Sequence, residues 1–541
     1  MAALKKVFSD RPFTGAVFYV VVLFLFEEWR FDFPQAKFFQ LVMTFMSEKE
    51  VLIAFSSGIT SFLFFCSFIW ITLRSSRTFQ VFYVTLFASA SLVQYSYWKA
   101  VERFLISADL KIAAATPIHT WRGASVLFFN WYFLLPVVVL ICFILLFSER
   151  QGWRPSLIRL GYIILSLTIL ATAHSLTKGP LNLGSSVPAF YQTISQSVID
   201  SIISHQREIV DYHHPILPEN NIVLVIDESI RGDHLSINGY RRETTPFLSM
   251  LADTEDGFHT FGLAVAGATC SYSSNGLILT GVRPGLDDFE LTVTYPTLFQ
   301  YAKAMGYKTY YIDAQTNSLW NGLTDQDLSF IDTWLKARDF GNDFQSDFRA
   351  ADRIADIVSE GTGNFIVLNK RGVHFLYESS YPPEAVVWLP LPGDYTSHPE
   401  LVSNPYDNGI LYNLNTFFDR LLINTTILEN TTILYTSDHG QTLFEEHATW
   451  LHCNNTAQEA TVPLILIGRN LPPIADRPRF SHSNILPTLL DLMAVPPSQR
   501  LHSYSSLLFS GADDSIKDHY FFDGSLRLIL FLNPETDPID D

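Results

Sequence analysis

The sequence predicts a chain of two parts: an N-terminal transmembrane domain of five helices and an α/β domain built on a mostly parallel central sheet. Long uncharged runs occur only in about the first third of the 541 residues, and most are long enough to cross a bilayer as a helix. Further along, short apolar runs alternate with helical patterns, as in a parallel sheet covered on both faces. We expect a transmembrane domain at residues 1–178, a bridging segment at 179–220 and an extracytoplasmic domain at 221–541.

Five uncharged windows form the predicted transmembrane domain. The first is short and ends at Glu27 and Glu28, but no small-residue cleavage site follows it, so we interpret it as an uncleaved span and not as a signal peptide. The windows are residues 12–26, 52–73, 79–98, 123–148 and 160–177.

Basic residues give these spans an orientation. They concentrate before the first span and in the short loops after the second and fourth spans, which places those segments in the cytoplasm. An odd number of spans then puts everything after Lys178 on the opposite side of the membrane. The residues that set the orientation are Lys5, Lys6, Arg11, Arg74, Arg77, Arg150, Arg154 and Arg159.

Residues 187–214 have the pattern of an amphipathic helix. Phe190, Ile194, Val198 and Ile202 recur at helical spacing with polar residues between them. Such a helix either lies on the membrane surface as a bridge or packs on the soluble domain.

Short apolar or β-branched runs predict the strands of the second domain. Strands are expected at residues 222–226, 309–312, 365–368, 432–435 and 464–467, and helices at 297–305, 411–424 and 485–493. The proline-rich residues 381–405 predict a surface loop or lid. Ligands bind beyond the carboxyl ends of parallel strands, so the polar residues that follow each strand are candidates for a site.

The charge of the chain argues against a nucleic-acid partner. The net charge is −18, and no cluster of Lys and Arg provides the positive surface that a phosphate backbone requires. We attribute this acidity to a solvated surface together with carboxylates that bind metal.

Two pairs of polar residues follow predicted strands. Asp227 and Glu228 come directly after one strand, and Asp438 and His439 follow another. Buried carboxylates are costly unless they are paired or bind a metal, and a mixture of oxygen and nitrogen donors suits Zn²⁺. The two strand ends should share one edge of the sheet, so we predict a metal site there. The sequence leaves two questions open: whether this site binds one ion or two, and whether the metal is zinc or another divalent ion.

Two histidines and a run of hydroxyl residues complete the candidates. His374 follows a strand, and His452 lies thirteen residues after His439; the alternative for each is an ordinary core or surface histidine. Small and hydroxyl residues precede an apolar helix, where they either cap the helix or supply a nucleophile at its positive end. These hydroxyl residues are Thr269, Ser271, Ser273 and Ser274. Nearby Cys270 and Cys453 form a disulfide or are two unrelated thiols.

Taken in order, these segments resemble the phosphoethanolamine transferases that modify lipopolysaccharide, within the wider alkaline phosphatase/sulfatase-like superfamily. The matching segments are VIDESIRGDHLSINGYRRETTPFL, GVHFLYESSYP, TSDHGQTLFEEHATWLHC and HSNILPTLLDLM. The layout of five spans, a bridge and an extracytoplasmic catalytic domain is similar too. The resemblance implies an alkaline phosphatase-like catalytic fold.

The resemblance also implies roles for single residues. Glu228, Asp438 and His439 fall on metal-ligand positions, with Asp227 as a further ligand. His374 and His452 would bind the substrate, by contacting its phosphoryl oxygens or protonating the leaving oxygen. The transferases use a Thr nucleophile, but counting back from LILTG places Ser271 at that position and leaves Thr269 as the second candidate.

Two departures from the related patterns matter. A sulfatase needs a Cys with Pro or Ala two residues on and Arg four residues on, whereas Cys270 is followed by Tyr272 and Ser274. A sulfatase activity is therefore disfavoured. Ser379 and Ser380 stand where the transferases often carry Arg before Tyr-Pro, which bears on how the donor phosphate is recognised.

The resemblance implies transfer of phosphoethanolamine from phosphatidylethanolamine to a glycolipid acceptor, lipid A or core sugar, through a covalent phosphoenzyme. It places the enzyme in a bacterial inner membrane with its catalytic domain in the periplasm. The alternatives are a glycerol-phosphate transferase of the lipoteichoic-acid-synthase type, a membrane-anchored hydrolase and a non-enzymatic membrane protein.

Overall fold

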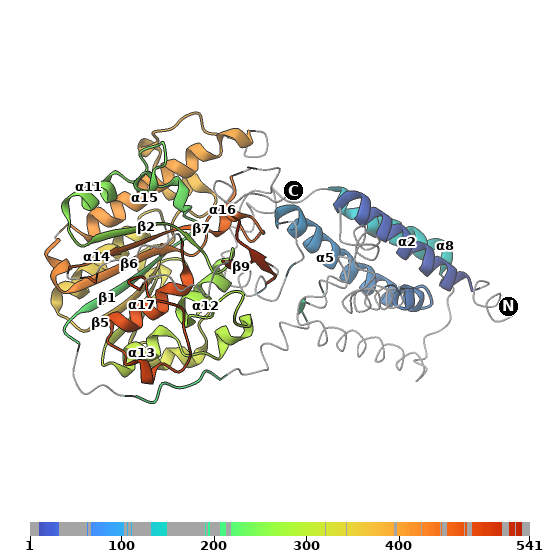
Figure 1. The fold of residues 1–541 in the computed structure, drawn as a ribbon. Coiled ribbons are helices and arrows are strands. Elements are labelled where there is room, and N and C mark those ends of the chain that lie inside the picture. The colour runs from blue at the N-terminus through green and yellow to red at the C-terminus, as the bar shows by residue number, and fades with distance from the viewer. Residues whose placement is uncertain are drawn as a thin grey trace. The chain divides into compact units, whose positions relative to one another are not determined.

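The computed structural model divides the chain into two compact units, Met1–Ser204 and His205–Asp541, each of which is described by itself (Figure 1). The residues that the structure describes are 10–31, 62, 66–101, 105, 110, 131–148, 190, 193–194, 206–212, 218–319, 321–341, 343–393, 398–423, 425–443, 445, 452–469, 471–472, 479–510, 519–524 and 526–532.

The first unit is helical where it is described. Its helices are α2 (Arg11–Phe31), α5 (Arg77–Val101), the 3-10 turn Trp131–Leu134 and α8 (Leu135–Phe147) (Figure 1). They fall on three of the five predicted windows, residues 66–73 are helical in a fourth, and window 160–177 lies outside the described residues. No helix in the described part of the chain is both long and apolar enough to cross a membrane.

Aromatic and aliphatic side chains hold these helices together. Tyr19 of α2, Phe87 of α5 and Leu140 of α8 are fully buried in one cluster. The Tyr19 hydroxyl also donates a hydrogen bond of 3.0 Å to the Pro136 carbonyl, which satisfies its polar group within an apolar environment.

The second unit contains an eight-stranded sheet in the order β4-β3-β5-β1-β6-β7-β2-β8. The pairs on either side of β1 are parallel, as are β3–β5, β3–β4 and β2–β8, and β7 alone runs against its neighbours. The strands are β1 (Asn221–Asp227), β2 (Phe258–Val265), β3 (Lys308–Asp313), β4 (Thr333–Leu335), β5 (Asn364–Asn369), β6 (Thr431–Ser437), β7 (Thr461–Ile467) and β8 (Phe480–Ser481). The predicted mostly parallel sheet is confirmed.

Helices cover both faces of this sheet (Figure 1). One face carries α11 (Pro246–Thr254), α14 (Ser346–Glu360) and α15 (Ser403–Leu421), and the other carries α12 (Ser271–Thr280), α13 (Leu298–Ala304) and α17 (Ile485–Leu492). Strands buried on both faces must be apolar along their length, and β1, β5, β6 and β7 are buried at every residue.

Several features differ from the sequence predictions. β2 and the short strands β4 and β8 were not among the predicted strands, and β9 (Tyr520–Phe522) and β10 (Leu528–Leu530) form a separate antiparallel pair. Residues 206–212 are not helical, so the amphipathic helix does not extend to its predicted end. There Arg207 is instead buried against Asp327, with a distance of 2.8 Å between Nε and Oδ2.

Candidate active site

The carboxyl ends of β1, β6, β5 and β3 lie on one edge of the sheet, because these strands are mutually parallel. β1 delivers Asp227 and leads into Glu228, and β6 leads directly into Asp438 and His439. The Asp438 backbone N–H donates to the Asp227 carbonyl at 2.9 Å, which ties the two strand ends together.

Glu228, His439 and His452 offer ligand atoms that all lie within 4.8 Å of one another. His439 Nε2 is 3.6 Å from Glu228 Oε1 and 3.4 Å from Asp438 Oδ2. The ring of His452 lies 4.4 Å from that of His439, measured between centroids. Four groups that can bind a metal therefore converge at the sheet edge.

The electrostatics of these carboxyl groups favour a bound cation. Burial alone would raise the pKa of Glu228, but the neighbouring histidines His439, His374 and His452 lower that pKa to about 2. Burial, together with the charge of Glu228, raises the pKa of Asp438 well above its usual value. Two close buried carboxylates are both ionised only when a cation compensates them.

The residues present fit a divalent cation. Asp438 Oδ2 is buried and accepts no hydrogen bond from the residues that the structure describes. An unsatisfied buried carboxylate oxygen is unfavourable, and a metal ion would satisfy it. Because the cluster combines carboxylate oxygens with imidazole nitrogens, zinc suits it better than magnesium or calcium.

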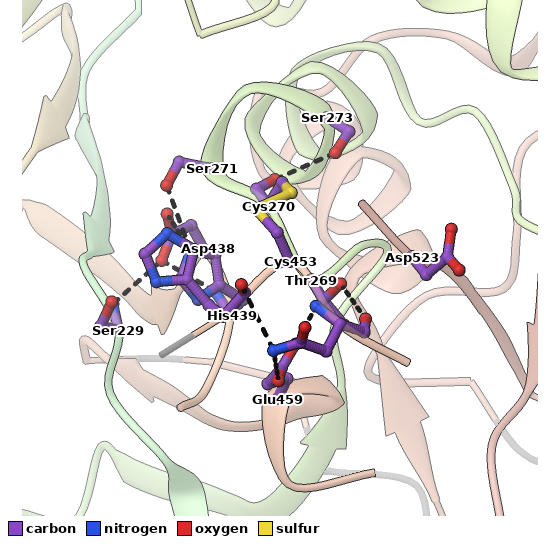
Figure 2. Close-up of a disulfide and its surroundings, with 12 residues drawn as sticks. Ser229, Thr269, Cys270, Ser271, Ser273, Asp438, His439, Cys453, Glu459 and Asp523 are labelled. Carbon is purple, nitrogen blue, oxygen red and sulfur yellow. Dashed lines mark hydrogen bonds and ion pairs between the residues drawn. A yellow bond between two sulfur atoms is a disulfide. The ribbon is translucent and has the colours of Figure 1, made fainter. Parts of the chain in front are cut away.

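Ser271 is the first residue of α12, and its hydroxyl points at this cluster (Figure 2). Ser271 Oγ lies 3.2 Å from Glu228 Oε2 and 3.1 Å from His439 Nε2. The N-terminus of a helix presents free N–H groups and a positive dipole end, which favour an anionic phosphoryl group at this point.

Thr269, the second candidate nucleophile, has a different environment. It is fully buried, and its hydroxyl donates to the Asn454 carbonyl at 2.7 Å. Cys270 and Cys453 form a disulfide with a Cα–Cα distance of 4.8 Å (Figure 2), so the interpretation as two unrelated thiols is wrong.

Asp227 forms an ion pair with a partner from β5's carboxyl end. Lys370 Nζ lies 2.5 Å from Asp227 Oδ2, and both side chains are completely buried. The Tyr435 hydroxyl donates to the same oxygen at 3.0 Å, and the Glu228 backbone N–H donates to Oδ1 at 2.9 Å. Both oxygens of Asp227 are thus satisfied within the protein.

His374 lies at the exposed edge of the site. Its ring is 6.0 Å from that of His452 between centroids, and its Nδ1 lies 2.6 Å from the Phe375 carbonyl. Gly372, two residues earlier, has a φ of +57°, and a Cβ there would come within 2.5 Å of Asp227 Oδ1. Only glycine permits this close approach of the His374 loop to the end of β1.

Gln315 and Lys370 also lie at this edge of the sheet, although neither was predicted from the sequence. Gln315, just beyond β3, donates a hydrogen bond to Glu228 Oε2. Both are polar residues that follow an apolar strand within two residues, which is the same sequence signal that identified the acids and histidines of the site.

The family model named Sulfatase matches residues 220–495, just over half of the chain. The chain belongs to the sulfatase family. Within it, the resemblance to phosphoethanolamine transferases is confirmed. The Kdo(2)-lipid A phosphoethanolamine 7''-transferase of Salmonella typhimurium is 24% identical over 287 residues, 51% of this chain and 48% of that one. Phosphoethanolamine transferase CptA of the same organism is 29% identical over 240 residues, 41% of this chain and 40% of that one.

This sulfatase-family chain thus spans about half the length of the relatives that it matches. A solved structure supports the fold. The integral membrane protein lipooligosaccharide phosphoethanolamine transferase A (EptA) from Neisseria meningitidis superposes with a TM-score of 0.57 at 17% identity, covering 88% of this chain and 95% of that one. The alkaline phosphatase-like catalytic fold is therefore confirmed.

Proposed function

We propose that this chain is a membrane-anchored, metal-dependent transferase that moves phosphoethanolamine from phosphatidylethanolamine to a lipopolysaccharide acceptor, lipid A or core sugar. The relatives named as phosphoethanolamine transferases support this class of reaction. One observation carries it for this chain: the Ser271 hydroxyl lies at a helix N-terminus within 3.2 Å of Glu228 and His439.

Glu228, Asp438, His439 and His452 would hold a zinc ion. This assigns His452 to the metal, in place of the substrate-binding role that the resemblance implied, because one of its ring nitrogens lies within 4.8 Å of the Glu228 and His439 ligand atoms. A bound zinc ion lowers the pKa of a nearby hydroxyl and offsets negative charge on a phosphoryl group. Asp227 is paired with Lys370, so we propose a single metal ion.

The reaction then proceeds in two transfers. The Ser271 hydroxyl first releases its proton to water. Ser271 Oγ then attacks the phosphorus of the donor lipid, the bond from phosphorus to the diacylglycerol oxygen breaks, and diacylglycerol leaves after taking up a proton. His374, exposed at the edge of the site, is placed to supply that proton. A hydroxyl or phosphate of the acceptor next attacks the phosphoethanolamine ester and releases Ser271.

The disulfide argues against hydrolysis of sulfate esters. A sulfatase makes formylglycine from a free cysteine, whereas Cys270, the cysteine beside Ser271, is bonded to Cys453. The disulfide also fits an oxidising compartment such as the bacterial periplasm.

The proposed location follows from the substrates and from the apolar windows. Residues 1–178 would form the five-helix anchor in the inner membrane, 179–220 the bridge and 221–541 the periplasmic catalytic domain. Tethering to the bilayer raises the effective concentration of a lipid donor at the site.

The test is intact-mass analysis of the full-length protein in detergent after incubation with phosphatidylethanolamine and zinc, followed by peptide mapping. A phosphoethanolamine adduct on Ser271 is expected, and the Ser271→Ala variant should carry none. A glycerol-phosphate adduct formed only with phosphatidylglycerol would move the chain to the rival transferase class. Turnover with water as the sole acceptor would indicate a hydrolase.

A further inference from the structure

Five residues connect the segments that carry Ser271, His439 and His452, and we call them the brace. The brace lies beside the metal-binding cluster, and none of its side chains belongs to that cluster (Figure 2). Its members are Thr269, Cys270, Cys453, Asn454 and Glu459.

The first part of the brace joins the start of α12 to the loop after His452. Cys270 immediately precedes Ser271, and Cys453 immediately follows His452, so the disulfide links the neighbours of two site residues. Two further bonds run alongside it. The Cys453 N–H donates to the Thr269 carbonyl at 2.9 Å, and the Thr269 hydroxyl donates to the Asn454 carbonyl at 2.7 Å.

The second part joins that loop to the segment after His439. The Asn454 backbone N–H and side-chain amide donate to the two carboxylate oxygens of Glu459 at 2.7 and 2.9 Å. The Thr442 hydroxyl donates to Glu459 Oε1 at 3.2 Å, and the Gly440 N–H donates to the Glu459 carbonyl at 2.7 Å. Glu459 is fully buried. Its hydrogen bond from Thr442 is buried as well, and its two bonds from Asn454 are partly buried, which strengthens them relative to bonds in water.

The backbone of the loop needs such support. Cys453 has a φ of +71°, in the left-handed region that residues with a side chain rarely adopt. A residue persists there when its surroundings determine it. Without the brace, the peptide that carries His452 would relax towards other conformations.

We propose that the brace is a positioning device that fixes His452 against Glu228 and His439, and thereby completes the zinc site next to Ser271. The inference rests on the proposed function only for its choice of metal. Thr269 acts here through Asn454 and Cys453, not as a nucleophile. Partners that hold a metal ligand in place typically change metal affinity by roughly 10–100-fold when they are removed.

The experiment measures zinc affinity by chelator competition on the full-length protein in detergent, which needs no turnover. The Cys270→Ser/Cys453→Ser variant should bind zinc roughly 10–100-fold more weakly. In a His452→Ala background, the same two changes should alter the affinity by less than about twofold, because the ligand that the brace positions is already gone. Cys142→Ser, an exposed free cysteine, is the matched control and should leave affinity unchanged.

Reduction of the folded protein guards against misfolding of the variant. Tris(2-carboxyethyl)phosphine donates two electrons to the disulfide, and water supplies the phosphine-oxide oxygen and the two thiol protons. The reduced wild-type protein should show the same loss of affinity. Equal losses with and without His452 would reveal general loosening and overturn the proposal, as would unchanged zinc affinity in both the variant and the reduced protein.

Thr269 provides a second arm with a conservative rescue. Thr269→Val removes the hydrogen bond to Asn454 at nearly constant volume and should weaken zinc binding, whereas Thr269→Ser should restore it. Thr269→Val binding zinc like the wild type would remove Thr269 from the brace. Zinc binding that follows all these expectations, in a protein that forms no phosphoethanolamine adduct, would keep the brace and reject the proposed reaction.

Discussion

Replacing Lys370 by Met tests whether Asp227 is a structural partner or a metal ligand. The Lys370 ammonium contacts Asp227 Oδ2 at 2.5 Å and Asn413 Oδ1 at 2.9 Å, and both members of the ion pair are completely buried. Met fills similar space without the charge. The variant should lose about 3–5 kcal/mol of stability, because it leaves an uncompensated carboxylate in the interior.

A double variant separates the effect of the unpaired charge from the effect of packing Met in place of Lys370. Burial raises the pKa of Asp227 even in the presence of Lys370, so loss of the ammonium will raise that pKa further. The double variant Asp227→Asn/Lys370→Met removes both charges and should recover most of the loss. Unfolding of the full-length protein, followed by tryptophan fluorescence at fixed zinc concentration, measures both variants side by side with the wild type.

Zinc affinity supplies the result that would refute this reasoning. Asp227→Asn keeps an acceptor for Lys370 and Tyr435, so it should change zinc affinity by less than about threefold. Glu228→Gln removes a proposed ligand, so it should weaken zinc binding by at least about tenfold. If both variants lost zinc to the same extent, Asp227 would be a ligand and the single-metal proposal would be wrong.

Three further predictions concern the nucleophile, the metal and pH. Ser271→Ala should lower the transfer rate by more than about a thousandfold in a lipid-headgroup transfer assay, as removal of a nucleophile does. Transfer that persisted in this variant would reject Ser271 as the nucleophile. Removing the metal with a chelator should lower the melting temperature, and zinc should restore it better than magnesium, because imidazole donors favour zinc; equal rescue by magnesium would contradict the proposed donor set. Burial raises the pKa of Glu459 to about 7. The folded state therefore binds the proton of the Glu459 carboxyl group more tightly than the unfolded chain does. As a result, the stability that this group contributes falls as the pH rises from about 4.5 to 7. In metal-free protein, the melting temperature of Glu459→Gln should therefore decrease less across that pH window than the melting temperature of the wild type. If both proteins showed the same dependence of melting temperature on pH, Glu459 would not titrate there.

The sequence was sufficient to predict the edge of the sheet where the site lies. Apolar runs ending in Asp227 and before Asp438 implied parallel strands, and parallel strands deliver the residues that follow them to one edge. That prediction needed only local patterns. The reversed strand β7 could not be predicted this way, since a strand buried on both faces has the same apolar pattern in either direction.

The partners of the site residues depend on long-range packing and could not be read from local patterns. Lys370 is 143 residues from Asp227 in sequence, and Gln315 is 87 residues from Glu228. The disulfide remained an open alternative for the same reason, since its cysteines are separated by 183 residues. Sequence spacing identifies such groups as candidates, but only the folded chain shows which of them meet.

The distribution of charge supports the proposal of a single metal ion. Asp227 and Asp438 lie at the ends of neighbouring strands, but Lys370 neutralises only the first. Asp438 and Glu228 share His439 between them, and Asp438 Oδ2 accepts no hydrogen bond from any described residue. The buried ammonium of Lys370 beside Asp227 would repel a second metal ion. The unsatisfied oxygen of Asp438 and the nearby carboxylate of Glu228 would attract one metal ion. In the proposed reaction, an ion held by these residues would put its positive charge next to Ser271, where a phosphoryl group gains negative charge during transfer.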